Sequence, residues 1–299
     1  MNSISEAGRN KVRIIHVITR FDKGGSAENT FLSVKGLDKT RYDAWLIQGS
    51  SRESRMDGAE HSAVAKNLAE LEEAGVHVIT LPDMVRKIAP FQDARAFFSL
   101  SRIFRQIHPR IVHTHTSKAG FLGRWAARLS RVPIIVHTPH GHVFWGYFNT
   151  SMTRLFKILE RMTGRITDCL VMLTEQEKED HLGFHIAPER KFVVIHSGVD
   201  FQPFTAPLPD PAAVRRQFKI PTSAFVIGSV GRLTAVKGHR FLLEAMARLM
   251  PRHENLACVL LGDGELREEL QSLAARLGIG NRVFFLGWHA DVAPVISMF

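Results

Sequence analysis

The chain contains 299 residues, of which 45% are hydrophobic and 23% are charged, and its formal net charge at pH 7 is +10. These values are typical of a soluble globular chain that is long enough for two domains. Because no apolar run has membrane-spanning length and residues 1–13 lack the apolar core of a secretion signal, we expect a cytoplasmic protein.

The first predicted strand, residues 11–19, is apolar and rich in β-branched side chains, so we expect it near the centre of a sheet. Gly24 and Gly25 follow it and precede a predicted helix that begins at Ser26. Glycines at such a turn let the backbone approach a ligand, and a helix N-terminus favours an anion. A plain tight turn explains the pair of glycines equally well.

The next elements argue against a nicotinamide cofactor. The second predicted strand, residues 43–48, ends in Gln48 instead of the acidic residue that holds a ribose in dehydrogenases, and no G-x-G-x-x-G sequence precedes it. The polar segment 49–61 is predicted to be a loop. It is followed by a predicted helix at 62–74, a strand at 76–81 and a long amphipathic helix at 91–108.

The segment 111–148 is the one around which we expect the fold to be organised. A strand at 111–114, a helix at 117–130 and a strand at 133–138 predict a parallel βαβ unit, because only a crossover connection returns the next strand in parallel. Both strands continue into loops that are rich in histidine. In open α/β sheets, ligands bind beyond the carboxyl ends of the strands, so these loops are candidate sites.

The same region is strongly basic. Between Arg86 and Arg165 there are fourteen Lys and Arg residues but only two acidic residues, Asp93 and Glu160. This bias indicates a nucleic acid, an acidic phospholipid or a phosphorylated substrate, although solvated helix faces explain it equally well. We find no RNP aromatic pattern, zinc-finger spacing or Gly-x-x-Gly clamp, which disfavours nucleic acid. The aromatic cluster at 144–148 favours an anionic membrane surface instead.

Further elements complete the first half of the chain. A basic amphipathic helix is predicted at 150–165 and strands are predicted at 168–173 and 192–195. Between those strands, Thr174 and Glu177 have the three-residue spacing of a capping box, which marks the start of a helix.

The segment 201–211 contains four prolines and no periodic apolar pattern, which predicts an interdomain connection. Cys169 and Cys258 lie in predicted strands on either side of it and are expected to be buried thiols rather than a disulfide or metal pair. We therefore predict Rossmann-like domains at residues 1–203 and 204–299 that face each other across a cleft. The second contains predicted strands at 224–230, 256–261 and 283–286 and helices at 239–250, 265–277 and from 291 onward.

Eight short motifs run in a fixed order over nearly the full length of the chain. They are GGSAEN, HTHTSKAGFLGRWAA, VHTPHGHVF, LTEQEKED, VIHSGVD, VGRLTAVKG, LLGDGELREEL and VFFLGW. Together they resemble the motifs of the family 4 glycosyltransferases, which are retaining sugar transferases of the two-domain GT-B architecture. The resemblance implies an α/β GT-B fold.

The resemblance also implies a donor site. In the family, the loop after the first strand closes over the donor diphosphate, which corresponds to Gly24 and Gly25 here. Arg232 and Lys237 match the cations that hold this diphosphate, and Gly264 falls on the same nucleotide side. Two fixed cations would stabilise the charge that develops on a departing nucleoside diphosphate. His140 matches the histidine that lies against the donor sugar, and a front-face retaining reaction needs no protein nucleophile.

The expected acceptor side consists of His115, Ser117, His142 and Glu175, although helix capping explains Ser117 and Glu175 equally well. A metal site built from the histidines of these loops is disfavoured, because no carboxylate joins them and the family works without a metal. We therefore expect neither a metal nor a cofactor.

The chain departs from the family pattern at its end. Family members continue with an E-x7-E segment whose glutamates hold the donor sugar and the nucleotide ribose, and this segment is not present before Phe299. The second domain is therefore expected to be truncated, with an uncovered apolar sheet edge.

The resemblance favours a hexosyltransferase that moves a hexose from a UDP- or GDP-sugar to a hydroxyl acceptor with retention. The basic and aromatic content of the first domain favours a lipid-linked or polysaccharide precursor at the inner face of a membrane. One alternative is a truncated, non-catalytic nucleotide-sugar-binding protein or transferase subunit. Another is a different GT-B enzyme, such as a nucleotide-sugar epimerase or a phosphorylase. The HTHTSKAG and VGRLTAVKG motifs disfavour the epimerase, and the lack of a lysine in a motif that suits a pyridoxal cofactor disfavours the phosphorylase.

Overall fold

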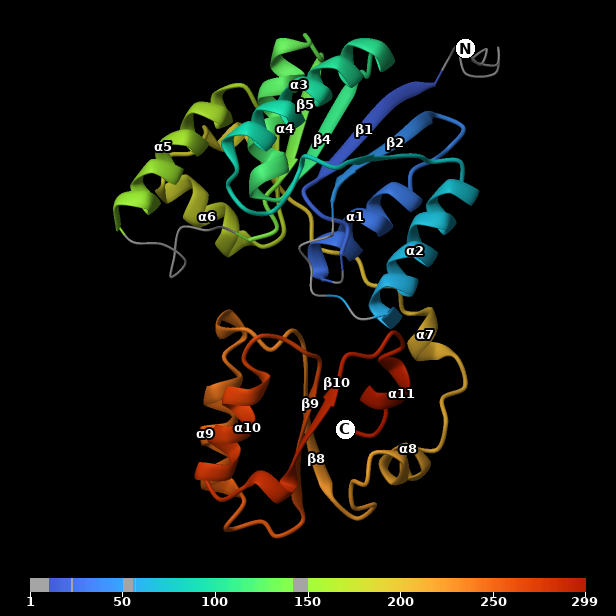
Figure 1. Ribbon diagram of the computed structural model, residues 1–299, viewed down its shortest axis with the longest axis vertical. Coiled ribbons are helices and arrows are strands. Elements are labelled where there is room, and N and C mark those ends of the chain that lie inside the picture. Colours follow the sequence, from blue (N-terminus) through green and yellow to red (C-terminus); the bar gives the residue numbers. More distant parts are fainter. Residues whose placement is uncertain (1–10, 23, 51–55, 57, 142–149) are drawn as a thin grey trace. The chain divides into compact units, whose positions relative to one another are not determined.

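The computed structural model describes residues 11–22, 24–50, 56, 58–141 and 150–299 (Figure 1). Its contacts divide the chain into unit 1, Met1–Val199, and unit 2, Asp200–Phe299. The sequence placed this boundary between residues 203 and 204. Each unit has its own parallel sheet and its own hydrophobic cores. No helix among the described residues combines the length and the hydropathy that a bilayer crossing requires.

Unit 1 contains a sheet of seven parallel strands in the order β3-β2-β1-β4-β5-β6-β7. β1 lies inside this sheet between β2 and β4, which confirms the prediction from its apolar sequence. The strand order reverses between β1 and β4, and such a switch point is where open α/β sheets bind ligands. The strands are β1 (Val12–Ile18), β2 (Tyr42–Gly49), β3 (His77–Leu81), β4 (Ile111–His115), β5 (Ile134–Thr138), β6 (Cys169–Met172) and β7 (Phe192–Val194).

The helices of unit 1 cover the two faces of the sheet unequally. α1 (Gly25–Lys35) and α2 (Gly58–Glu73) pack on one face, against Ile14 and Ile18 of β1. The alternate residues of β1, Ile15 and Val17, pack with the helices of the other face. Right-handed crossovers place four helices on that face. They are α3 (Pro90–Ile107), α4 (Ser117–Leu129), α5 (Thr150–Arg165) and α6 (Glu175–Gly183).

Near β7, no described helix of unit 1 covers the first face of the sheet. Val193 and Ile195 are exposed there, and Val171 of β6 is only half-buried.

Cys169, also on β6, is half-buried rather than buried, whereas Cys258 in unit 2 is fully buried; both are free thiols. The predicted loop at 49–61 is also shorter than expected, since α2 already begins at Gly58.

The central βαβ unit is packed unusually closely. A β-carbon on Gly120 of α4 would lie 2.4 Å from the ring of His137, and one on Gly123 would lie 2.7 Å from Thr114. Arg124 of the same helix is completely buried and donates two hydrogen bonds, of 2.8 and 2.9 Å, to the Glu160 carboxylate on α5. The two glycines thus bring α4 onto the sheet, and the ion pair fixes α5 beside it.

Unit 2 contains three parallel strands in the order β10-β9-β8. β9 (Leu256–Leu261) is buried along its whole length, because α9 and α10 cover one of its faces and α8 and α11 the other. The remaining elements are α7 (Gln202–Thr205), α8 (Pro211–Gln217), β8 (Phe225–Val230), α9 (His239–Leu249), α10 (Arg267–Arg276), β10 (Val283–Gly287) and α11 (Ala293–Ile296); short 3-10 turns lie at Glu189–Lys191, Ala235–Lys237 and Gly280–Arg282.

The proline-rich connection is more ordered than the sequence suggested. It contains α7 and the start of α8, two helices that the sequence analysis did not predict. Pro203 and Pro211 lie in the first turns of these two helices, where the missing proline N–H has no helical partner to lose.

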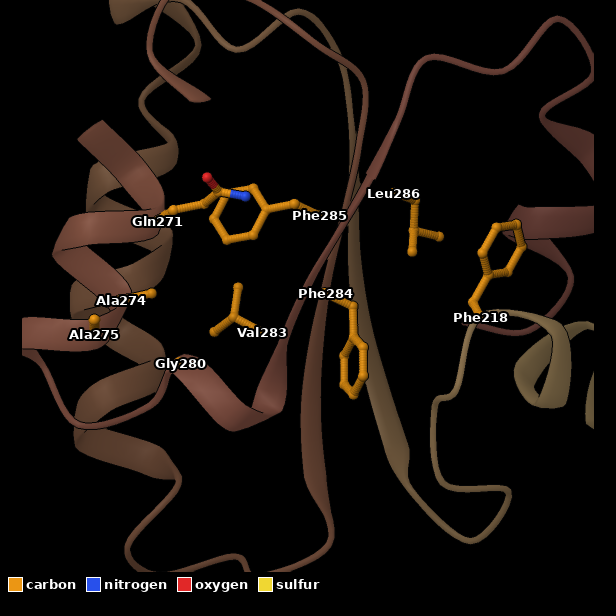
Figure 2. A pocket seen from close by; sticks show the side chains of 9 residues that line it. All are labelled: Phe218, Gln271, Ala274, Ala275, Gly280, Val283, Phe284, Phe285 and Leu286. Carbon is orange, nitrogen blue, oxygen red and sulfur yellow. The ribbon is translucent and has the colours of Figure 1, made fainter. Parts of the chain in front are cut away.

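The edge strand β10 borders an apolar cavity of about 490 Å³. Figure 2 shows Val283 and Phe285 pointing to the α10 side of this strand, while Phe284 and Leu286 point to the Phe218 side. This is the alternation expected of a strand. Phe284, Phe285 and Leu286 of this edge strand are half-buried, whereas Val283 is buried.

Candidate functional site

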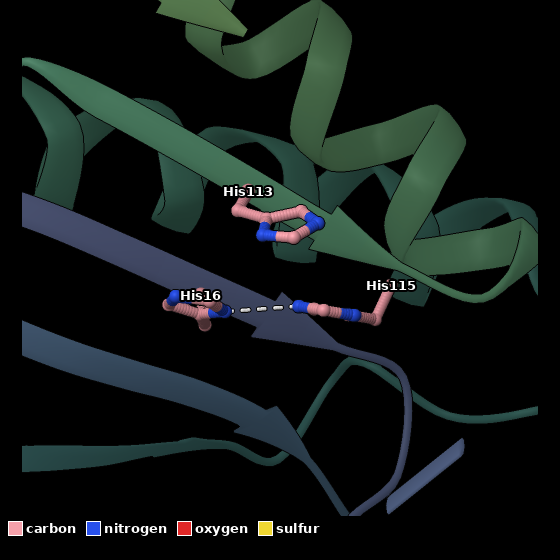
Figure 3. A group of neighbouring side chains, drawn as sticks. All are labelled: His16, His113 and His115. Atoms are coloured by element: carbon pink, nitrogen blue, oxygen red, sulfur yellow. Dashed lines mark hydrogen bonds between the residues drawn. The ribbon is translucent and has the colours of Figure 1, made fainter. Parts of the chain in front are cut away.

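A line of three histidines runs along the carboxyl ends of β1, β4 and β5. His16 Nδ1 lies 2.9 Å from His115 Nε2, and His115 Nδ1 lies 2.9 Å from Nε2 of His140, which follows β5. A fourth histidine, His113, is paired in register with His16, and His115 lies two residues further along β4. His16, His113 and His115 therefore project from the same face of the sheet. Figure 3 shows His16, His113 and His115, with the His16–His115 hydrogen bond as a dashed line.

These rings are neutral at pH 7. Burial lowers the pKa of His16 to about 3 and that of His140 to about 4. Burial, helped by the neighbouring rings, also holds the pKa values of His113 and His115 well below the usual range. The site in unit 1 therefore presents hydrogen-bonding groups without charge.

Neutrality couples the proton positions of the three rings. Each of the two hydrogen bonds requires one proton, and each neutral imidazole carries only one. The third proton must therefore reside either on His16 Nε2 or on His140 Nδ1. Within the described chain, both of these atoms are buried without a hydrogen-bond partner. The state of His140 toward a ligand thus depends on His115 and on His16, a residue that the sequence interpretation treated only as part of a strand.

The backbone at these strand ends is constrained. Thr116 has φ 66° and His140 has φ 59°, a region that non-glycine residues rarely adopt and that is often found at binding sites. Thr19 at the end of β1 stabilises the first loop, since its hydroxyl lies 2.8 Å from that of Thr116 and accepts a hydrogen bond of 3.0 Å from the Ala119 N–H.

Glu177 holds the loop that carries His140. Its buried carboxylate accepts hydrogen bonds from the Gly141 N–H (3.0 Å) and the Leu173 N–H (2.8 Å). The Glu177 N–H in turn donates to the Thr174 hydroxyl at 3.0 Å, which confirms the predicted N-cap of α6. The sequence drew attention to Glu177 only as a capping residue, and its link to Gly141 was missed.

The expected acceptor residues occupy different environments. His115 is buried within the histidine line, whereas Ser117 and Glu175 are the exposed first residues of α4 and α6. His142 lies outside the described residues. The structure therefore connects His115 with His140 and does not join Ser117 or Glu175 to them by a described hydrogen bond.

A cavity of about 310 Å³ opens beside α1 on the uncovered part of the sheet. His113 and Thr138 line it from the strands and are hydrogen-bonded to each other at 2.8 Å. Asn29 lines it from α1 and donates a hydrogen bond of 3.0 Å to Ser197. His113 thus lines the cavity, whereas His16 and His115 are buried and do not line it.

His16, His113 and His115 offer ring nitrogens that lie within 4.8 Å of one another, so we considered a metal ion. Neutral imidazoles can bind zinc, but a zinc–nitrogen distance of about 2.0–2.1 Å at three rings would require the shared proton of the His16–His115 bond to leave. No carboxylate belongs to the group. The arrangement fits a hydrogen-bonded chain better than a metal centre, and the absence of a metal stays a prediction.

The glycines at the start of α1 are not explained by contacts within unit 1. Gly24 has an extended conformation that any residue can adopt, with φ 163°. A β-carbon on Gly25 would meet nothing within 4 Å. No side chain caps this helix at Gly24, so its first N–H groups point outward from a position without steric bulk.

In unit 2, the strand ends form two interlocked loops. The Leu233 N–H donates a hydrogen bond to the Asp263 carbonyl at 3.0 Å, and the Leu266 N–H donates to the Leu233 carbonyl at 3.1 Å. A β-carbon on Gly264 would lie 2.4 Å from the Leu233 carbonyl oxygen. The fold itself therefore requires glycine at 264, and any role of this residue toward a nucleotide stays a prediction.

These loops carry Arg232 and Lys237, and Lys237 directly precedes Gly238, the N-cap residue of α9. Both side chains are exposed. The N-cap Gly238 supplies no side-chain cap, and its φ of 67° suits glycine. His239 follows at the first helical position, where burial and then the charge of Lys237 lower its pKa. Cations beside an uncapped helix N-terminus form an anion-binding arrangement.

The predicted site residues thus fall into two groups, His140 with its supporting residues in unit 1 and the cations of unit 2. That the two groups meet across a cleft stays a prediction.

Comparison with known proteins follows this division. The profile of Glycosyltransferase Family 4 matches residues 23–202, and that of Glycosyl transferases group 1 matches residues 211–298. The chain is 29% identical over 233 residues to the Escherichia coli UDP-Gal:alpha-D-GlcNAc-diphosphoundecaprenol alpha-1,3-galactosyltransferase, covering 77% of this chain and 60% of the relative. The chain thus spans about three-fifths of the length of that curated relative.

Solved structures show the same fold. Anabaena HepE in complex with UDP and glucose superimposes with a TM-score of 0.73 at 20% identity, covering 96% of this chain and 72% of that one. A UDP-N-acetylglucosamine 2-epimerase from Listeria monocytogenes gives a TM-score of 0.62 at 14% identity, covering 94% and 70%. At these identities the likeness establishes a GT-B fold alone, and the fold by itself does not separate a transferase from an epimerase.

Proposed function

Because the chain belongs to Glycosyltransferase Family 4, we propose that it transfers a hexose from a nucleoside-diphosphate sugar to a hydroxyl acceptor with retention of configuration. The observation that carries the proposal is the exposed Lys237 next to the uncapped N-terminus of α9, with the exposed Arg232 earlier in the same loop. Fixed positive charge and free N–H groups at one point suit a diphosphate.

The cations act on the leaving group. As the bond between the sugar anomeric carbon and the phosphate oxygen breaks, negative charge grows on the nucleoside diphosphate, and Arg232 and Lys237 stabilise it. A uridine nucleotide is favoured over a guanosine nucleotide, since the E. coli relative is named for UDP-galactose and the Anabaena protein binds UDP.

His140 acts on the sugar. With a pKa of about 4, its neutral ring is too weak a base to take a proton from an acceptor hydroxyl at pH 7. It helps to position the donor sugar, and the hydroxyl proton of the acceptor passes to the departing phosphate oxygen as the new glycosidic bond forms on the same face. This assignment requires neither a protein nucleophile nor a metal ion.

For the acceptor, we propose a lipid-linked or polysaccharide precursor used in cell-surface glycan synthesis. Support comes from the diphosphoundecaprenol acceptor in the name of the E. coli relative. The excess of basic residues between Arg86 and Arg165 also suits an acceptor that carries phosphates.

The test is a transfer assay with sugar-labelled UDP- and GDP-hexoses and a sugar-diphospholipid acceptor, combined with calorimetric titration of UDP and GDP. We expect a labelled lipid product from one donor, with an α-linkage by NMR. The double variant Arg232→Ala/Lys237→Ala should give no product, while Arg252→Ala, an exposed arginine on another loop, should behave like the parent.

Three other outcomes would change the assignment. Nucleotide binding without any product would support a non-catalytic binding protein. Conversion of the donor without an acceptor would support an epimerase. Failure to bind either nucleotide would contradict the donor site.

A further inference from the structure

The outer surface of α5 carries an apolar stripe. Leu155, Ile158 and Met162 are 47%, 51% and 46% exposed, and their spacing of three and four residues places them on one side of the helix. The opposite side, around Thr163 and Gly164, is buried against the rest of unit 1. A surface helix normally turns its apolar side chains inward, so this outward stripe needs an explanation.

α3 repeats the pattern with aromatic side chains. Phe91 and Phe98, two helical turns apart, are 88% and 66% exposed. The exposed Arg95, Arg102 and Arg105 lie on the same side of the helix, at four-, seven- and three-residue spacings. Arg95 pairs with Asp83 at 2.7 Å, so it adds little net charge.

The segment between Arg86 and Arg165 leaves most of its arginines without a carboxylate partner among the described ion pairs. Its two acidic residues, Asp93 and Glu160, pair with inner cations: Lys118 Nζ lies 2.5 Å from Asp93, and buried Arg124 binds Glu160. The carboxylates are therefore already engaged inside the unit. Among the described residues, no ion pair joins these carboxylates to the outer arginines of α3 or α5.

α4 links the two helices into one surface. The Trp125 indole N–H donates to Thr163 of α5 at 3.1 Å, and the Ser130 hydroxyl donates to the Ser101 carbonyl of α3 at 3.1 Å. We call the resulting surface the α3–α5 face. It consists of the exposed side chains Phe91, Phe98, Leu129, Leu155, Ile158 and Met162 together with Arg102, Arg105, Arg128, Arg154, Arg161 and Arg165.

We propose that the α3–α5 face binds the surface of an anionic lipid bilayer. Apolar side chains that alternate with arginines on helices lying along the surface can enter the headgroup boundary while the guanidinium groups bind lipid phosphates. A nucleic acid could bind the arginines and stack its bases on the phenylalanines, but it would leave the aliphatic α5 stripe exposed to water. A bilayer uses both kinds of side chain at once.

This inference deepens the proposed function, because it names the surface on which a lipid-carried acceptor would be met. The role of the α3–α5 face in acceptor binding rests on the proposed function, but its binding to vesicles can be measured without a sugar nucleotide. A failure of one therefore leaves the other open to its own test.

The experiment is co-sedimentation of the full chain with vesicles of phosphatidylcholine alone or mixed with phosphatidylglycerol. We expect binding to the mixed vesicles and at least about tenfold weaker binding to phosphatidylcholine alone. The triple variant Arg102→Gln/Arg105→Gln/Arg154→Gln should bind mixed vesicles about 100-fold more weakly, since each surface arginine contributes roughly fivefold.

A matched control changes the same charge elsewhere. Arg248, Arg252 and Arg276 are exposed residues of unit 2, and their triple glutamine variant should bind like the parent. A second variant, Phe91→Ser/Phe98→Ser/Leu155→Ser/Ile158→Ser, should lose vesicle binding while all positive charges remain. Thermal unfolding and UDP titration of each variant check folding and the donor site independently.

Several results would overturn the proposal. They are no binding of the parent to mixed vesicles, an equal loss in the unit 2 control, or unchanged binding in the serine variant. Capture of RNA or of a soluble protein by this face, with no effect on vesicle binding when its residues are changed, would also overturn it.

Discussion

The two units of this protein differ in the charge of the side chains that follow their parallel strands. In unit 1, the strands end in buried, neutral histidines that bond to one another. In unit 2, β8 is followed by a loop that exposes Arg232 and Lys237, and Lys237 directly precedes the N-cap of α9. Burial removes charge from the first set, and exposure preserves it in the second.

This difference matches the two parts of a nucleotide sugar. Neutral hydrogen-bonding groups suit the hydroxyls of a sugar, for which a fixed charge would be of little use. Fixed cations and helix N–H groups suit a diphosphate. In the proposed function, one type of α/β architecture therefore binds the sugar in unit 1 and the diphosphate in unit 2, and the two units differ in the residues that follow their strands.

The largest expected effect exploits the pKa values of unit 1. An unfolded histidine has a pKa near 6.5, whereas folding lowers those of His16 and His140 to about 3 and about 4. Below pH 6.5 the unfolded chain therefore takes up protons that the folded chain does not, and stability falls as the pH falls toward 4. The loss is about 1.4 kcal/mol per histidine and pH unit, or roughly 5 kcal/mol for the pair between pH 6.5 and 4.5.

Urea unfolding at several pH values, followed through the fluorescence of Trp45 and Trp125 in unit 1, measures this effect. Above about pH 7.5, where the unfolded histidines are neutral too, these two histidines should contribute almost no pH dependence. An unchanged unfolding free energy between pH 6.5 and 4.5 would mean that the rings are not buried in the neutral form.

The next effect concerns the cations of unit 2. Arg232→Ala/Lys237→Ala should weaken UDP binding about 100-fold, because two charge-assisted contacts to phosphate, each about 1.5 kcal/mol, are lost. Calorimetric titration gives the value, and the histidine line of unit 1 should be unaffected, as judged by the unfolding experiment. Equal UDP affinities for the variant and the parent would remove the contrast between the units.

Glu177→Gln should sharpen the role of unit 1. Replacing a buried carboxylate by an amide removes a charge-assisted hydrogen bond to Gly141 or Leu173, which should lower the unfolding free energy by about 2 kcal/mol. Turnover should fall about tenfold as His140 loses its fixed position, while the UDP dissociation constant stays the same. Glu179→Gln, an exposed neighbour on α6, is the control, and an equal fall in its turnover would argue against the positioning role.

The smallest effect is expected at Thr174. Thr174→Ala removes the N-cap of α6 and should cost about 1 kcal/mol of unfolding free energy in unit 1. UDP affinity should not change. A stability loss of several kcal/mol would indicate that Thr174 also holds the His140 loop.

Much of this architecture could be predicted from the sequence, because buried parallel strands are written as apolar, β-branched runs. The central position of β1 and the βαβ unit around residues 111–138 followed from such runs. The helices at 202–205 and 211–217 did not, since proline counts as a helix breaker unless its place in the first turn is known.

The site was less predictable, because its important contacts join residues far apart in the chain. His16 and His115 are 99 residues apart and meet only through the register of β1 and β4. Glu177 reaches Gly141 across 36 residues. A buried histidine inside an apolar strand and an acidic residue at a capping position were the available signals, and neither names its distant partner.

The most direct test of the account is a crystal structure of the protein with UDP bound. We expect the diphosphate within hydrogen-bonding distance of Arg232 and Lys237, with its oxygens facing the first N–H groups of α9. Phosphates bound away from this helix, with both cations turned to solvent, would contradict the central claim that unit 2 holds the nucleotide.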